Sequence, residues 1–190
     1  MRQANRIVAG VLEMLQDNMR PGLTTRQMDR WAEEYCRDHG AKAAFSGYRG
    51  FPGSLCVSIN EQVVHGIPSK KVRVREGDLV SVDFGVIYHG FYGDSAVTIP
   101  VGKISAKNKR LIDVTQQALE RGINQVQLGN RISDISRAIQ EYAEMHDYSV
   151  VRQFVGHGIG TSLHEAPEVP NYVQEQQTPR IVEGMFKMGR

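Results

Sequence analysis

Two aspartates interrupt a strongly apolar stretch between residues 80 and 98, VSVDFGVIYHGFYGDSAVT. A turn centred near Tyr88 and His89 would place Asp83 and Asp94 directly opposite each other on the two strands of a hairpin. Directly opposed side chains have Cβ atoms about 5 Å apart, where two negative charges repel each other. A divalent cation between the carboxylates is the simplest compensating charge, so the pair predicts a metal site. The alternative is structural: one aspartate caps a turn and the other pairs with an arginine.

Three histidines lie in short segments that are rich in glycine or proline. His65 lies in VVHGIP, and His157 and His164 lie in VGHGIGTSLHEAPEVP, all of which have the pattern of short strands. The glycines on either side of His157 allow another backbone or a substrate to approach closely. One such histidine is more often structural than a ligand, but three of them together with two strand aspartates favour a metal-dependent hydrolase.

The composition is that of an ordinary globular protein. The chain has 190 residues, 41% of them hydrophobic and 23% charged, with a formal net charge of +2. This length suffices for one domain with a proper core. Basic residues gather only in short clusters at 70–75 and 107–110, so we expect no specific nucleic-acid partner. Two isolated cysteines and no stretch of membrane-spanning length predict a cytoplasmic protein without a membrane partner.

Helical and strand patterns follow one another along the chain. Four helices are predicted, two of them ending at Pro21-Gly22 and at Gly40, and two running from Lys107 to about Val126 and from Ser133 to about Met145. The second helix would be capped by Thr24 or Thr25. The segments LCVSIN, VVHGIP, LVSVDFGVIY and FYGDSAVTI predict strands, and more strand-like sequence begins at SVVRQFVGHGIG.

The two helical pairs resemble each other at a constant spacing. An offset of 107 residues aligns Leu12 with Leu119, Gly22 with Gly129, Arg30 with Arg137, Glu34 with Glu141 and Tyr35 with Tyr142. These identities follow the order of the predicted elements, which favours an internal duplication over coincidence. We therefore expect an α+β fold with two related halves, at about residues 1–105 and 106–190.

Three segments together resemble the signature sequences of type I methionine aminopeptidases, in the same order and spacing: FSGYRGFPGSLCVSINEQVVHGIP, VSVDFGVIYHGFYGDSAVTIPVG and VGHGIGTSLHEAPEVP. The likeness extends from the first helix to about Gly184. It implies a single metallopeptidase-like domain, residues 1–190, with the pita-bread fold of creatinase and the aminopeptidases. In that fold two pseudo-symmetric αβ halves surround antiparallel sheet, and here the second half would be incomplete. The implied activity is removal of N-terminal methionine from nascent polypeptides.

The resemblance also implies a role for each histidine and aspartate. Asp83, Asp94 and His157 would bind metal, with Asp94 bridging two ions. His65 and His164 would be catalytic and would contact the substrate. The family uses two divalent ions, with Co, Mn, Fe and Zn as candidates.

Three further residues are implied to bind the methionine side chain of the substrate, namely Tyr48, Phe51 and Cys56. Relatives often carry phenylalanine where this chain has Leu163. The partners implied are the N-terminal methionine peptides of nascent chains, and association with the ribosome is a further family expectation.

Two glutamate ligands of the family are missing from the positions where the resemblance places them. One belongs five residues after the methionine of a Gly-Met pair, and after Gly184-Met185 that position holds Arg190. The other belongs to a later strand, past residue 190. We therefore expect a C-terminally shortened or altered enzyme with impaired activity and one ion or none. The competing interpretation is a non-catalytic pita-bread module that binds peptides or a protein.

Overall fold

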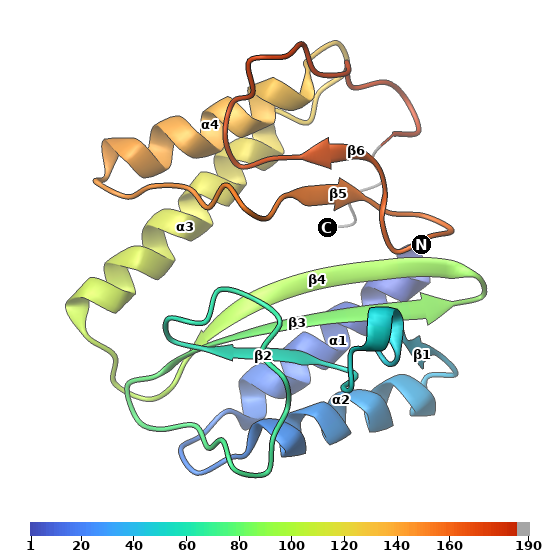
Figure 1. Cartoon of the computed structure of the whole chain (residues 1–190), viewed down its shortest axis with the longest axis vertical. Coiled ribbons are helices and arrows are strands. Elements are labelled where there is room, and N and C mark those ends of the chain that lie inside the picture. Colours follow the sequence, from blue (N-terminus) through green and yellow to red (C-terminus); the bar gives the residue numbers. More distant parts are fainter. Residues whose placement is uncertain (186–190) are drawn as a thin grey trace. The chain divides into compact units, whose positions relative to one another are not determined.

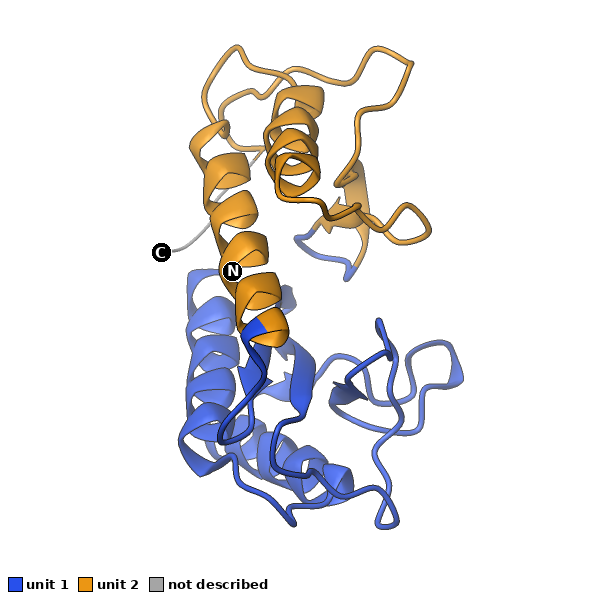
Figure 2. Cartoon of the chain, turned by 90° about the vertical axis from the view of Figure 1, so that its left-hand side faces the viewer, with its two compact units in different colours: residues 1–106, 159–163, 189 blue, residues 107–158, 164–188, 190 orange. Residues whose placement is uncertain are grey.

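The computed structural model describes residues 1–185, which form two compact units (Figure 1, Figure 2). The first unit comprises residues 1–106 and the separate segment 159–163. The second comprises residues 107–158 and 164–185. No helix in the described part of the chain is long and apolar enough to cross a membrane.

The first unit contains two helices and a four-stranded antiparallel sheet. Its elements are α1 (Arg2–Asn18), α2 (Thr25–Asp38), β1 (Lys42–Ala43), the 3-10 turn η1 (Tyr48–Gly50), β2 (Cys56–Ile59), β3 (Leu79–Tyr88) and β4 (Phe91–Pro100). The central strand is β3, which pairs with β4 along one edge and with β2 and β1 along the other.

Both helices of the first unit begin and end where the sequence signals predict. The side chain of Thr24 caps α2 by accepting a hydrogen bond from the backbone N–H of Gln27 at 3.2 Å. Past the end of the helix, Gly40 adopts a left-handed φ of +67°, which glycine does without strain. In α1 the buried residues recur every three or four positions, and this apolar stripe packs on the sheet.

The two faces of β3 have different surroundings. Val80, Val82, Phe84 and Val86 are fully buried in the core formed with α1 and α2. Because side chains alternate along a strand, Asp83 and its odd-numbered neighbours point to the opposite face. The carboxylates in this apolar run therefore do not occupy core positions.

The register of the β3–β4 hairpin differs from the predicted one. Tyr88 pairs with Phe91, so the turn consists of His89 and Gly90, whose φ angles of +49° and +77° suit the two central positions of a tight hairpin turn. A turn centred at Tyr88 would instead have required a left-handed conformation from a bulky residue. The prediction that Asp83 and Asp94 face each other directly was therefore wrong by two residues.

The second unit contains α3 (Ala106–Asn124), α4 (Ile132–Met145), β5 (Gly156–Gly158) and β6 (Glu165–Val169). The two short strands pair antiparallel. Small apolar clusters hold the unit together, and one of them joins Ile132 and Ile135 of α4 to Ile181. All four predicted helices are present, with ends within about two residues of those expected.

Equivalent hydrogen bonds occur in the two units at the same offset of 107 residues. In the first unit the guanidinium of Arg73 donates to the carbonyl oxygen of Gly22 at 2.8 Å. In the second unit Arg180 donates to Gly129 in the same way at 2.9 Å. The internal duplication therefore extends to tertiary contacts between segments 51 residues apart in sequence.

The ends of α2 and α4 repeat a second arrangement. The ring of His39 lies 4.2 Å from that of Tyr35, and its Nδ1 is 2.8 Å from the Tyr35 carbonyl oxygen. His146 and Tyr142 repeat this with a ring separation of 4.3 Å and the same 2.8 Å contact. His39 and His146 are therefore the C-terminal caps of α2 and α4.

Candidate metal centre and substrate pocket

Asp83 and Asp94 approach each other on the sheet face that points away from the helices. Asp83 pairs with Ala96 and Asp94 with Gly85, so the two aspartates are diagonal neighbours on that face. Their carboxyl groups are joined by a hydrogen bond. Burial above all, then the charge of Asp83 and this hydrogen bond, raises the pKa of Asp94, the backbone N–H of Ser95 opposes the shift, and the resulting pKa is about 8.

The carboxylate pair fits a divalent cation. Two half-buried carboxyl groups joined by a hydrogen bond occupy a position where positive charge is favourable, and carboxylate oxygens suit hard and borderline divalent ions. Oδ1 of Asp94 is shielded from solvent, as expected for an inward-facing ligand atom. Within residues 1–185 no three side chains of His, Cys, Asp or Glu stand together as a ready-made metal cage. The pair therefore supplies part of a ligand set.

Cys56 lies on β2 directly opposite Asp83. Its side chain is buried and forms one wall beside the carboxylate pair. Burial above all, followed by the charges of Asp83 and Asp94, raises the pKa of this thiol to about 12, while the backbone N–H of His65 hydrogen-bonds to it and lowers the pKa slightly. The thiol is therefore protonated at neutral pH and presents a small, polarisable, uncharged surface.

An apolar cluster adjoins Cys56 within the first unit. Its buried members are Ala44, Phe45, Cys56 and Leu163, and Tyr48, Phe51, Ile87, Tyr92 and Ile159 pack against them. The three predicted pocket residues are thus brought together in one cluster. Sequence reasoning missed Phe45, Ile87, Tyr92 and Ile159. Period-two alternation from Asp83 and Asp94 would have found the two strand residues, because Ile87 and Tyr92 share their face.

The segment 159–163 is built into the first unit although its neighbours in sequence belong to the second. The carbonyl oxygen of Gly160 accepts a hydrogen bond from the backbone N–H of Tyr92 at 2.8 Å. Leu163, which is 3% exposed, packs in the apolar cluster with Cys56. This segment directly follows Gly158 and directly precedes His164.

His157 and His164 lie together in the second unit. His157 is the middle residue of β5, and His164 immediately precedes β6. Their ring centroids are 4.1 Å apart, with the planes tilted by 41°. Nδ1 of His157 is 3.0 Å from the carbonyl oxygen of Gly158, which can only accept, so this contact favours the tautomer with the proton on Nδ1.

His65 lies in a loop, so the prediction of a strand over VVHGIP was wrong. Its φ of +61° is left-handed, and its side chain is exposed. The loop is held to β2 because the next residue, Gly66, accepts a hydrogen bond from the backbone N–H of Val57 at 2.9 Å. His65 therefore stands beside Cys56, on a backbone that is fixed to the sheet.

The carboxylate pair and the duplicated αβ architecture are features expected of a metallopeptidase. Residues 1–186 match the sequence pattern of Metallopeptidase family M24. The chain therefore belongs to this family, whose members use divalent metal ions.

Proteins similar to this chain in sequence include methionine aminopeptidases of several bacteria. The methionine aminopeptidase of Clostridium acetobutylicum is 49% identical over 185 residues, which are 97% of this chain and 74% of that protein. Methionine aminopeptidase 1 of Bacillus subtilis is 46% identical over 185 residues, again 97% of this chain and 74% of that protein. The predicted resemblance and the predicted class of enzyme, a methionyl aminopeptidase among the hydrolases, are confirmed.

Solved structures agree with these sequence relatives. The crystal structure of methionine aminopeptidase from Rickettsia prowazekii has a TM-score of 0.93 and 41% identity, and that from Thermotoga maritima has 0.94 and 40%. Each comparison covers 97% of this chain and 74% of the other. A prolidase from Pyrococcus furiosus, at 24% identity and a TM-score of 0.81, shares the fold. The predicted pita-bread fold is confirmed.

Proposed function

We propose that this chain removes the N-terminal methionine of polypeptides with a divalent metal ion held by Asp83, Asp94 and His157. The observation that carries the proposal is the half-buried, hydrogen-bonded pair of carboxyl groups, in a chain 49% identical to a methionine aminopeptidase. The proposed substrates are peptides and nascent chains that begin with methionine.

Chain connectivity supports the addition of His157 to the carboxylate pair. Only Gly158 separates it from the segment 159–163, which hydrogen-bonds to Tyr92, two residues before Asp94. His164 follows Leu163 directly, and Leu163 packs in the cluster of Cys56. Since consecutive Cα atoms are about 3.8 Å apart, both histidines are tethered within a few residues of the proposed centre.

Each residue then has a defined task in peptide hydrolysis. A bound divalent ion lowers the pKa of water and polarises the scissile carbonyl group. Asp83 and Asp94 hold their oxygens at fixed positions because both lie on paired strands. His65 and His164 are proposed to contact the substrate and to move protons where charge develops.

The methionine side chain is proposed to bind against Tyr48, Phe51 and Cys56. The protonated thiol and the two aromatic rings provide an uncharged, polarisable surface that favours a thioether. Leu163 completes this surface where relatives carry phenylalanine, so the pocket is proposed to accept slightly larger side chains.

The proposed number of ions is one. Three protein ligands with open positions are the usual arrangement of a catalytic zinc site. Arg190, at the position expected for a family glutamate, lies outside the described residues. Hydrolysis is proposed to be slower than in a site with two ions.

Metal titration and peptide hydrolysis test this function on the same samples. Isothermal titration with Mn²⁺ or Co²⁺ should give about one site in the wild type and none in Asp94→Ala, and only the wild type should release methionine from Met-Ala-Ser. Asp113→Ala is the control, because this carboxylate is exposed on α3 and pairs with Lys109 at 2.9 Å. It should retain both properties.

Two results would contradict the proposal. Methionine release that survives Asp94→Ala would refute the assigned site. A wild type that binds metal and Met-Ala-Ser without releasing methionine would identify a non-catalytic peptide-binding module instead.

A further inference from the structure

A hollow with basic walls lies at the start of α2 in the first unit. Its volume is about 420 Å³, and it is lined by Thr24, Arg26, Gln27, Arg30 and Lys70. The lining residues come from α2 and from the loop between β2 and β3. The fold brings Lys70, from the basic cluster 70–75, beside Arg26 and Arg30 of the helix.

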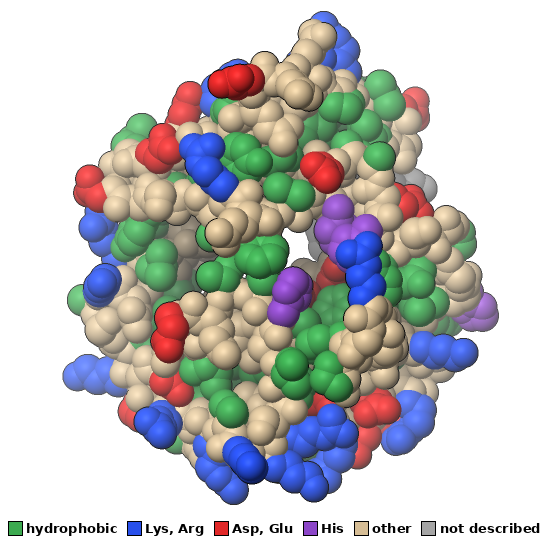
Figure 3. Space-filling view, in the orientation of Figure 1, with side chains coloured by type: hydrophobic (Ala, Val, Ile, Leu, Met, Phe, Trp, Pro, Cys, Tyr) green, Lys and Arg blue, Asp and Glu red, His purple; other side chains and the backbone are tan. Residues whose placement is uncertain are grey.

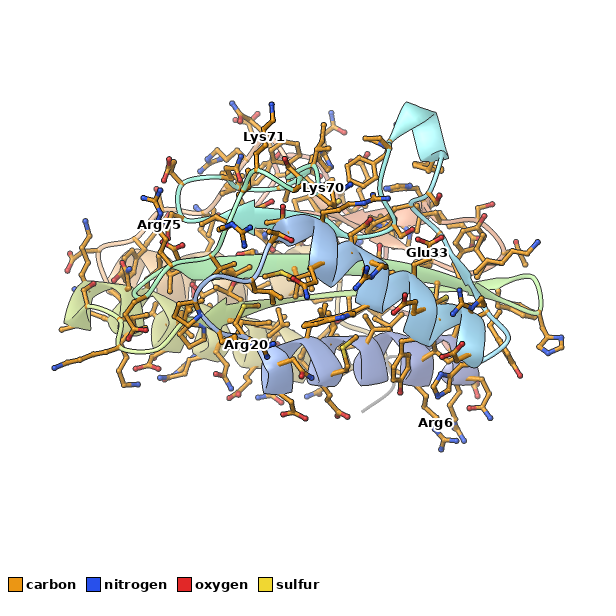
Figure 4. The ribbon with its side chains drawn as sticks, turned by 90° about the horizontal axis from the view of Figure 1, so that it is seen from below. Arg6, Arg20, Glu33, Lys70, Lys71 and Arg75 are labelled. Atoms are coloured by element: carbon orange, nitrogen blue, oxygen red, sulfur yellow. The ribbon has the colours of Figure 1, made fainter. Side chains whose placement is uncertain are left out.

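The basic surface continues beyond the hollow. Lys71, Arg73 and Arg75 follow Lys70 on the same loop, and Arg20 lies at the turn between α1 and α2; all five side chains are exposed. Figure 4 shows Lys70, Arg75 and Arg20 near the end of the unit where α2 begins. In the space-filling view, Lys and Arg side chains gather along the lower edge, where Figure 1 places α2 and its neighbouring loops (Figure 3).

Only some of these positive charges are neutralised. Arg26 pairs with the buried Asp29 at 2.7 Å, and Arg30 pairs with Glu34 at 3.6 Å. Among the described residues, no acidic side chain forms an ion pair with the remaining lysines and arginines of this surface, which are Arg20, Lys70, Lys71, Arg73 and Arg75. Glu33 lies farther along α2 (Figure 4). The surface therefore carries a net positive charge.

The duplicated construction shows that the fold does not require this charge. The second unit keeps the structural arginine, since Arg180 repeats the hydrogen bond of Arg73. Arg30 is also repeated, as Arg137. At the offset of 107 residues, however, the basic positions 26, 70, 71 and 75 hold Ser133, Gln177, Thr178 and Val182, and Gln27 is replaced by Asp134. The same backbone arrangement thus forms with neutral or acidic residues, and the excess charge of the first unit has a separate cause.

We propose that this basic surface binds the phosphodiester backbone of a nucleic acid. The charges are spread along α2 and the loop 70–75 and do not converge on one point, which suits an elongated polyanion. Among the described residues no aromatic side chain lines the hollow, so base stacking is not part of the interaction. Binding is therefore independent of sequence, strongly dependent on salt, and separate from the metal centre.

The test is fluorescence anisotropy with a labelled 20-nucleotide RNA hairpin at several salt concentrations. The variant Arg30→Gln/Lys70→Gln/Lys71→Gln should raise Kd about tenfold or more and reduce the slope of log K against log salt by about 2 to 3, near 0.7 to 0.9 per lost contact. The control Arg6→Gln/Lys42→Gln/Lys107→Gln removes equal charge from other exposed positions and should change Kd less than about threefold. Asp94→Ala should bind RNA like the wild type.

Several outcomes would overturn this proposal. They are equal weakening by the control variant, an unchanged salt slope, full competition by millimolar inorganic phosphate, and competition by poly-glutamate as strong as by unlabelled RNA. The last two would assign the surface to a single phosphate or to an acidic polypeptide. Should the triple variant fail to fold, Lys70→Gln/Lys71→Gln, in the exposed loop, gives the same comparison with a smaller expected change.

Discussion

Replacing Gly66 with alanine should destabilise the first unit strongly, because the new methyl group would meet backbone. An ideal Cβ at this position lies 1.9 Å from the carbonyl oxygen of Val57 and 2.9 Å from the backbone nitrogen of Ser58. Real Cβ contacts essentially never fall below 3.0 Å, so the loop must move away from β2 by about 1 Å. No side chain can rotate to relieve the overlap, since the obstacle is the strand itself.

The expected cost follows from the contacts that this displacement disrupts. The backbone N–H of Val57 donates to Gly66 at 2.9 Å, and Gly66 donates to Oγ of Ser58 at 3.1 Å. Losing each hydrogen bond costs about 1 kcal/mol, and overpacking adds about 1–3 kcal/mol. The free energy of unfolding should therefore fall by about 3–5 kcal/mol, and Tm by about 6–20 °C for a chain of this size.

Urea and thermal unfolding measure this effect, and Gly50→Ala is the control. Gly50 has a left-handed φ of +82° and nothing within 4 Å of its Cβ position, so alanine there adds about 1–2 kcal/mol of backbone strain without overlap. Gly66→Ala should also lower methionine release, because it displaces the neighbouring His65. A Gly66→Ala variant no less stable than Gly50→Ala would refute this account of the loop.

Three further predictions concern stability. Arg73→Ala and Arg180→Ala remove equivalent hydrogen bonds and should each cost about 1 kcal/mol in urea unfolding; a difference much larger than 1 kcal/mol would contradict equivalent roles. Asp29→Ala should cost about 3 kcal/mol by the same assay, because this buried carboxylate accepts two backbone N–H bonds and an arginine, and a loss below 1 kcal/mol would count against that role. Burial, with a smaller contribution from Glu33, raises the pKa of Cys36 from 9.0 to about 11, so the folded state should lose stability as pH rises from about 9 to 11. Cys36→Ala should flatten that decline in Tm measured against pH, and an unchanged decline would exclude this thiol as its source.

The sequence predicted helices and strands well where an apolar periodic pattern extended over many residues and capping residues marked the ends. Helices α1 to α4 and the strands β3 and β4 all have strong apolar periodicity, and Thr24 and Gly40 mark ends by their own chemistry. The loop around His65 was mistaken for a strand because VVHGIP, a short segment with several apolar residues, is compatible with both a strand and a loop. Only the close packing of Gly66 on β2, a tertiary contact, determines its conformation.

The candidate site was predictable in composition and less so in geometry. Asp83 and Asp94 were recognised as a pair, and the register error of two residues left them on the same face, because two is the side-chain period of a strand. An error of one residue would have placed them on opposite faces. The remaining pocket residues, such as Phe45, gave no signal of their own, since an apolar residue after a short loop is usually core.

Comparison of the two units shows which features of the helical pairs are common to both and which side-chain contacts belong to one unit alone. The hydroxyl of Tyr142 donates to the side chain of Gln117 at 2.5 Å, whereas the equivalent Tyr35 packs over Gly10, where a Cβ would lie 2.1 Å from its hydroxyl oxygen. The same ring position is thus maintained by a hydrogen bond in one unit and by close packing in the other. The two units thus keep the position of a side chain while its contacts differ. Residues that differ in type between equivalent positions of the two units are therefore candidates for a functional role. Arg26, Lys70, Lys71 and Arg75 meet this criterion, because the equivalent positions 133, 177, 178 and 182 carry no basic residue.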